Sequence, residues 1–190
     1  TDRSVEMAKK YNVKLEVKSS FHKVPGTIVK EVTTLEKMLI RGVTRDNDVA
    51  RIAIIGVEDT PGIAFKVFSA LAKEGVNVDM ILQSIGHGGT KDIVFTVTKN
   101  NLTKTLAIID GLKDSMHYQE VNHRDDLSKV SIVGAGMTNN PGVAARMFEA
   151  LFAADINIHM ISTSEIKIST LINVNNAERA VKVIHDQFRV

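Results

Sequence analysis

Cysteine and tryptophan are absent from this sequence of 190 residues, and aromatic residues make up only 5% of it. Without cysteine the chain can form neither a disulfide nor a thiolate site, which is compatible with the reducing cytoplasm where we expect it to act. The scarcity of aromatics argues against an RNA-binding sheet, which needs rings to stack on bases. No apolar run approaches the roughly 20 residues of a membrane span, and the N-terminal residues lack the apolar core of a signal peptide.

Charge and catalytic motifs are equally scarce. The 24 basic and 22 acidic residues leave a formal net charge of +2 that is spread along the chain, so neither nucleic acid nor a membrane is implied as a partner. The six histidines show no metal-ligand spacing, and there is no P-loop, Ser-His-Asp set or paired acid and base. We therefore expect no metal and no catalytic residue here. Because the sequence begins with Thr1 and enters a predicted helix end at once, we expect a fragment or one subunit of something longer.

What the sequence does contain is a motif written twice. The stretch "DTPGIAFKVFSALAKEGVN" at 59–77 returns as "NNPGVAARMFEALFAADIN" at 139–157. The two copies also match outside these stretches, at Ile52/Ile132, Gly56/Gly136, Met80/Met160, Ile81/Ile161 and Ser84/Ser164. A repeat this regular predicts two structural units of the same fold.

Each copy predicts the same order of elements. A short apolar strand (51–57 and 129–136) leads through a Pro-Gly turn into a helix whose apolar residues recur on one face. A second strand (76–84 and 156–164), an alternating third strand and a second helix (102–113 and 176–188) follow, and the first copy adds a strand around 117–122. We therefore predict an α+β fold of two ferredoxin-like βαββαβ units, each an antiparallel sheet with helices on one face.

The second copy ends directly after its second helix, so another segment must supply its fourth strand. We predict that the strand-like run 13–20, within an N-terminal segment of residues 1–33, fills this position. The first unit then comprises residues 34–123 and is inserted between the two pieces of the second unit, which are the N-terminal strand and residues 127–190. The run 37–46 is expected to pair with 49–57 as a hairpin.

The Pro-Gly turn of the first copy is the leading candidate site. At the start of a helix the N–H groups of Gly62, Ile63 and Ala64 lack helical acceptors and favour an anion. Asp59 stands beside this turn and can accept a hydrogen bond from an ammonium or hydroxyl group. Donors for a carboxylate next to an acceptor for an ammonium suit a zwitterion such as a free amino acid. The alternative is that the turn merely connects a strand to a helix.

Two asparagines, Asn77 and Asn157, stand where the second strand of each copy is predicted to begin. The simplest role of such a residue is to form a turn or a cap. If the two units pack side by side, however, the strand start of one faces the turn of the other. Asn157 then reaches the pocket of Asp59, and Asn77 reaches the matching pocket of Asn139.

These motifs carry a family likeness. The stretches "VEDTPGIAFKVFSALAKEGVNVDMILQS" and "VGAGMTNNPGVAARMFEALFAADINIHMISTSEIKIS" resemble the paired ACT domains at the C-terminus of bacterial aspartate kinase, and "VEMAKKYNVKLEVKSSF" resembles the junction leaving its kinase domain. The resemblance covers nearly the whole chain. It implies the regulatory region, or a separate small subunit, of an enzyme inhibited by threonine, lysine or both in the biosynthesis of lysine, threonine and methionine.

The resemblance also implies a set of effector contacts and partners. In similar proteins threonine lies between the first ACT unit of one chain and the second unit of its partner, which implies a homodimer. The contacts carried over to this chain are Asp59, Gly62, Ala64, Gln83, Asn157 and Ile158. A second, pseudo-symmetric pocket would use Asn77, Val78, Asn139, Val143, Ala144 and Ser164, although Ala144 and the nearby His159 depart from the family's usual residues.

The kinase domain is missing from this sequence, so ATP and Mg²⁺ would belong to a catalytic domain or α subunit elsewhere, and we expect no cofactor in this segment. Threonine is the favoured effector, because a short hydroxyl side chain suits a pocket bounded by a carboxylate and amides better than lysine's long ammonium side chain does. The rival interpretation is an ACT-type small-molecule sensor attached to another metabolic enzyme or to a regulator.

Overall fold

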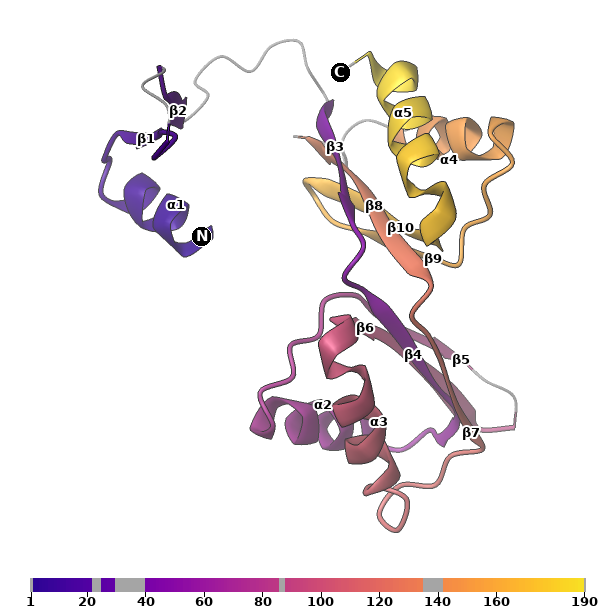
Figure 1. The fold of residues 1–190 in the computed structure, drawn as a ribbon. Coiled ribbons are helices and arrows are strands. Elements are labelled where there is room, and N and C mark those ends of the chain that lie inside the picture. The colour runs from indigo at the N-terminus through magenta and orange to yellow at the C-terminus, as the bar shows by residue number, and fades with distance from the viewer. Residues whose placement is uncertain (1, 22–24, 30–39, 86–87, 135–141, 190) are drawn as a thin grey trace. The chain divides into compact units, whose positions relative to one another are not determined.

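The computed structural model describes residues 2–21, 25–29, 40–85, 88–134 and 142–189. The chain divides into two compact units, Thr1–Met38 and Leu39–Val190. The smaller unit contains helix α1 (Asp2–Lys10) and an antiparallel pair of short strands, β1 (Leu15–Val17) and β2 (Thr27–Val29). The larger unit carries the two copies of the repeat (Figure 1).

The first copy forms a four-stranded antiparallel sheet in the order β5-β6-β4-β7. Its strands are β4 (Ala50–Glu58), β5 (Ile81–Ile85), β6 (Thr90–Val97) and β7 (Glu120–Arg124). Helices α2 (Ile63–Lys73) and α3 (Leu102–Asp110), the latter preceded by the 3₁₀ turn η1 (Lys99–Asn101), lie together beside this sheet (Figure 1). The element order is the one that the sequence predicts.

The second copy repeats the plan with strand order β3-β8-β10-β9. Its elements are β3 (Ile40–Asp46), β8 (Leu127–Gly134), α4 (Val143–Ala153), β9 (Met160–Thr163), β10 (Lys167–Asn173), the 3₁₀ turn η3 (Val174–Asn176) and α5 (Ala177–Phe188). The prediction of an α+β fold with two ferredoxin-like units is confirmed. Among the described residues, no helix combines the length and the apolar character that crossing a membrane requires.

Each copy has its own hydrophobic core between its sheet and its helices. In the first, α2 buries Ile63, Val67 and Leu71 against the alternate strand residues Ile93 and Phe95. These positions follow the helical period on one side and the strand period on the other, so one face of each element is apolar. The second core is built in the same way around α4, α5 and the inner residues of β8 and β10.

The strand that completes the second sheet is β3, and the prediction that residues 13–20 do so is wrong. β3 pairs antiparallel with β8 from Ile40 to Asp46, whereas β1 pairs with β2. The predicted hairpin of 37–46 with 49–57 is therefore also wrong, and residues 40–46, which we predicted within the first unit at 34–123, belong to the second sheet. The physical reason is burial: β3 brings Ile40 and Val43 into the second core, whereas Val17 is 57% exposed. The first copy is inserted between β3 and β8, as the missing strand implied.

Two short crossings, at 47–49 and 125–126, join the two copies. A third cluster of buried side chains packs around these crossings and consists of Val49, Met80, Leu127, Met160 and Leu171, with Val94 half-buried against it. We call this the junction cluster. Because Met80 and Met160 are matched positions of the repeat, the cluster is contributed by both copies.

The β3 assignment predicts a contrast between two single substitutions. Ile40→Ala removes a side chain that is 3% exposed in the second core, and we expect it to lower the free energy of unfolding by about 2–5 kcal/mol. Val17→Ala in β1 is the control and should change it by less than about 0.5 kcal/mol. Urea denaturation followed by circular dichroism measures both. An equal or larger loss for Val17→Ala would restore the N-terminal strand as the one that completes the sheet.

Candidate functional site

The turn between β4 and α2 begins with a bulge that needs glycine. The pairing of β4 with β6 shifts between Ile54 and Val57, and Gly56 between them has a φ of +67°. Its N–H donates to Asp92 Oδ1 at 2.9 Å, and a Cβ at Gly56 would lie 2.4 Å from the Gln119 side chain. A bulge increases the twist of a strand and redirects its end. Here it sets the direction in which the chain leaves the sheet toward the candidate site.

Gly62 then opens α2 in the left-handed conformation, with a φ of +93°. A side chain would be strained there, although nothing lies within 4 Å of where its Cβ would be. No side chain caps this helix start and no acidic residue stands in its first turn. The first N–H groups of the helix are therefore open to an anion, as the sequence predicts. Gly142 opens α4 with nearly the same geometry, at a φ of +96°.

The side chain of Asp59 lies beside this helix start, and its carboxylate forms an ion pair with Lys91 of β6. The carboxylate is 55% exposed, while the lysine side chain is only 17% exposed. The main-chain N–H of Asp59 donates to the carbonyl of Gly89 at 3.1 Å, which ties the turn to the β5–β6 hairpin. Sequence reasoning missed Lys91, because its position opposite Val57 depends on the bulged register of β4 and β6.

The other predicted contacts of the first copy fall into two groups. Ile63 is 4% exposed and its side chain belongs to the core, so only its main-chain N–H can serve a ligand, whereas Ala64 is exposed. Gln83 lies on β5, an edge strand of the sheet whose five residues are all exposed. Ile85 at its end is 97% exposed. The turn and this open edge belong to the same sheet.

Asn157 and Ile158 lie in the second copy, between α4 and the edge strand β9. Asn157 is exposed, and Ile158 is half-buried against the second core. Among the described residues of the single chain, no hydrogen bond joins Asn157 to Asp59 or Gln83. The structure thus places the turn residues in the first copy and Asn157 in the second, and among the described residues it shows no hydrogen bond between them.

The predicted second pocket is scattered in the single chain. Val143 is buried at the start of α4, and Ala144 is half-buried beside it. The hydroxyl of Ser164 donates to the carbonyl of Lys167 at 3.3 Å, across the β9–β10 hairpin. Asn139 lies outside the described residues.

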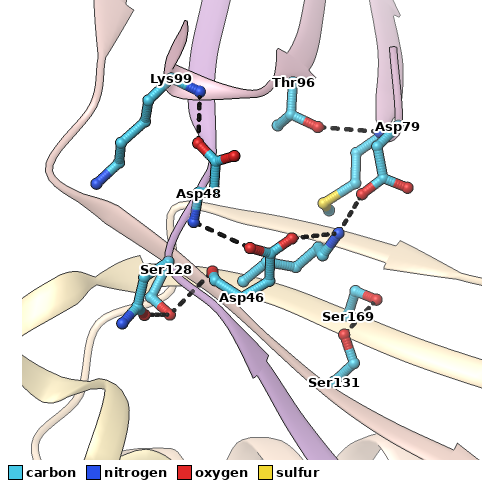
Figure 2. A network of polar contacts seen from close by, with 11 residues as sticks. Asp46, Asp48, Asp79, Thr96, Lys99, Ser128, Ser131 and Ser169 are labelled. Carbon is cyan, nitrogen blue, oxygen red and sulfur yellow. Dashed lines mark hydrogen bonds and ion pairs between the residues drawn. The ribbon is translucent and has the colours of Figure 1, made fainter. Parts of the chain in front are cut away.

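Asn77 and Val78 line a cavity of about 220 Å³ next to the junction cluster. Lys129 also lines this cavity and forms ion pairs with Asp79 and, at 3.4 Å, with Asp46. Figure 2 shows the surrounding polar network, in which the N–H of Asp48 donates to Asp46 and the N–H of Lys99 donates to Asp48. Burial disfavours the charge on Lys129, but its hydrogen bond to Asp79 and the two carboxylate charges outweigh burial and raise its pKa.

A second polar contact between the copies joins Arg124 of β7 to His159, which follows Ile158. The guanidinium Nη1 lies 3.3 Å from Nδ1 and 3.2 Å from Nε2 of the imidazole. The lone pairs of these two nitrogens diverge in the plane of the ring, so one guanidinium nitrogen cannot form a well-directed hydrogen bond to both. Burial and the charge of Arg124 lower the pKa of His159, with a smaller lowering from Arg51 and an opposing influence from Asp126.

The lowered pKa of His159 predicts a pH-dependent stability. At pH values between the lowered pKa of His159 and about 6.5, the unfolded chain binds more protons at this position than the folded chain does. The free energy of unfolding should therefore fall as the pH falls through this window. His159→Gln cannot titrate and should show a smaller fall between pH 7 and pH 5, measured by urea denaturation at each pH. His123→Gln, an exposed position on β7, is the control. An identical pH profile for parent and His159→Gln would contradict this prediction.

Comparison with known proteins agrees with this architecture. The ACT domain family matches residues 51–114, and a second ACT domain family matches residues 130–188. The aspartate kinase of Stutzerimonas stutzeri is 43% identical over 190 residues, which is 99% of this chain and 46% of that protein. The chain thus spans about half the length of the curated relatives that it matches.

Two solved structures complete the comparison. The ligand-free regulatory subunit of aspartate kinase from Thermus thermophilus is 41% identical with a TM-score of 0.75, over 79% of this chain and 99% of that one. A structure of aspartokinase α and β subunits contains a chain that is also 41% identical, with a TM-score of 0.74 over 80% of this chain and 99% of that one.

Proposed function

Because this chain belongs to the family of aspartate kinase regulatory regions with paired ACT domains, we propose that it is the part of such an enzyme that binds an amino-acid effector. The bound effector inhibits the kinase, and the product of the pathway thereby controls its first step. Catalysis itself, with ATP and Mg²⁺, belongs to a catalytic domain or subunit outside this sequence. The structure of aspartokinase α and β subunits supports such a pairing of two kinds of chain.

The observation that carries the proposal is the uncapped helix start at Gly62 beside the carboxylate of Asp59. An α-amino acid carries its carboxylate and its ammonium group on the same carbon atom, so the two charges lie close together. The N–H groups of the helix start complement the first, and Asp59 complements the second. The exposed Asp59 and Gly62 leave this arrangement accessible from solvent.

The missing half of the site comes from a second copy of this chain in our proposal. β5 and β9 each end a sheet and offer unpaired main-chain groups along one side. Ile81 and Leu82 of β5 and Ile161 of β9 are exposed at 53%, 45% and 41%. A two-fold dimer that places β5 of one chain against β9 of the other satisfies both edges and buries these side chains. It also brings Asn157 toward the partner's Asp59 turn.

Threonine is the effector that we propose first. Its short side chain ends in a hydroxyl, which can both donate to a carboxylate and accept from an amide. The polar side chains of the proposed pocket are one carboxylate and two amides, from Asp59, Gln83 and Asn157. Each can form a hydrogen bond with a small ligand. Lysine is the alternative effector, acting alone or together with threonine, and direct titration separates the two.

Two substitutions test the pocket. Asp59→Ala and Asn157→Ala each remove a hydrogen-bonding side chain, and we expect the affinity for threonine to fall by about tenfold to a hundredfold, as for a lost charged hydrogen bond. Asn157 is exposed, so Asn157→Ala should change the folding stability little, whereas Asp59→Ala also leaves the largely buried Lys91 without its partner and should lower the stability. Isothermal titration calorimetry with threonine, and separately with lysine, gives the affinities. Parent-like threonine binding in both variants would show that the site is misplaced.

The dimer has its own test. Leu82→Lys places a charge on the open edge of β5 and should weaken dimer formation, seen as a lower sedimentation coefficient at micromolar concentration. Ile28→Lys in β2 is a matched control, since Ile28 is 49% exposed and Leu82 is 45% exposed. Because the pocket is shared, threonine should strengthen the parent dimer. A parent that sediments as a monomer with threonine present would overturn the shared pocket.

A further inference from the structure

Lys91 occupies an unusual position for a lysine. It lies on β6 opposite Val57, on the same face as Ile93 and Phe95, which is the face that the helices cover. Its side chain is 17% exposed, and the ammonium group at its end reaches the carboxylate of Asp59. The ammonium of Lys91 therefore lies at Asp59, three residues before the glycine that opens α2, and most of the lysine side chain is shielded from solvent.

This position is electrostatically unfavourable unless an anion is close by. The start of a helix carries a partial positive charge, and a cation beside it is repelled. Asp59 offsets that repulsion, because its carboxylate pairs with the ammonium of Lys91. The carboxylate of Asp59 is therefore already paired with a cation of the protein before any ligand binds.

We propose that Lys91 determines the specificity of the Asp59 site, by favouring an amino acid with an uncharged side chain over one that carries a second ammonium group. This inference rests on the function proposed above. Lys91 does not change where the ligand binds, but it determines which class of amino acid the site accepts.

The charges around the turn favour a ligand with one ammonium group over a ligand with two. The α-carboxylate of a ligand is balanced by the helix start and by Lys91, and its α-ammonium is balanced by Asp59. A second ammonium, as in lysine, needs a second carboxylate. The nearest acidic neighbours along the strands are Glu58 and Asp92, and the alternation of each strand places them on the opposite face from Val57 and Lys91. Asp92 is also engaged by the N–H of Gly56.

The test compares neutral and charged replacements at one position. Lys91→Met keeps an unbranched side chain of nearly the same length and removes its charge, and Lys91→Arg keeps the charge. Titration calorimetry of each protein with threonine and with lysine gives the ratio of the two affinities. We expect Lys91→Met to shift this ratio by about tenfold toward lysine, and Lys91→Arg to keep the ratio of the parent. Lys73→Met, an exposed lysine in the last turn of α2, is the control and should leave the ratio unchanged.

Three results would overturn the proposal, and they are distinguishable. If the parent binds threonine while Lys91→Met keeps the parental ratio, the role of Lys91 is wrong and the proposed site stands. If Lys91→Met and Lys73→Met shift the ratio equally, the effect is one of net charge and not of the ion pair. If the parent binds neither amino acid, the proposed function fails together with this inference. Lys91→Gln provides a second neutral replacement if Lys91→Met does not fold.

Discussion

The junction cluster holds together the parts of this protein on which its proposed function depends. The two copies of the repeat are joined by two short crossings, and Val49 in the first crossing and Leu127 directly after the second are 3% and 0% exposed in the same cluster. Burial of such side chains is worth roughly 1.5–3 kcal/mol each, so the cluster resists separation of the two sheets. Lys129 adds an ionic contact, because it lies on β8 of the second copy and pairs with Asp79 of the first.

The same cluster gives a structural role to the matched methionines of the repeat. Met80 follows Asn77 by three residues, and Met160 follows Asn157 by three, so both strand starts are anchored in one core. A ligand that held Asn157 would act on the segment between that residue and Met160. His159 lies in this segment and contacts Arg124 of the first copy. Under the proposed function, a ligand held at Asn157 would therefore act next to a contact between the two copies, and coupling between sites needs such a connection.

The sequence predicted those features that depend on local periodicity. The strand-helix-strand order, the core positions such as Val67 and Phe95, and the glycine turns at Gly62 and Gly75 all follow from apolar spacing and from the residues that tolerate a positive φ. The origin of the fourth strand was not predictable in this way. Two segments, 13–20 and 37–46, have strand character, and only non-local pairing with β8 selects between them. Lys91 was missed for the same reason, because a bulge in the pairing of β4 with β6 places it opposite Val57 and near Asp59.

The two copies share a backbone plan but not its electrostatics. Gly62 and Gly142 open their helices at nearly the same φ, and the second residue after each helix is left-handed in both, as Gly75 in the first copy and as Asp155 in the second. A non-glycine residue costs more conformational free energy than glycine in the left-handed conformation, so the backbone of the second turn is more strained. Asp59 corresponds in the repeat to Asn139, which carries no charge. An amide cannot balance an ammonium as a carboxylate does, so a pocket built on the second copy would hold a zwitterion less tightly. The duplicated motif therefore supplies two similar scaffolds, of which the first carries the carboxylate on which the proposed amino-acid site depends.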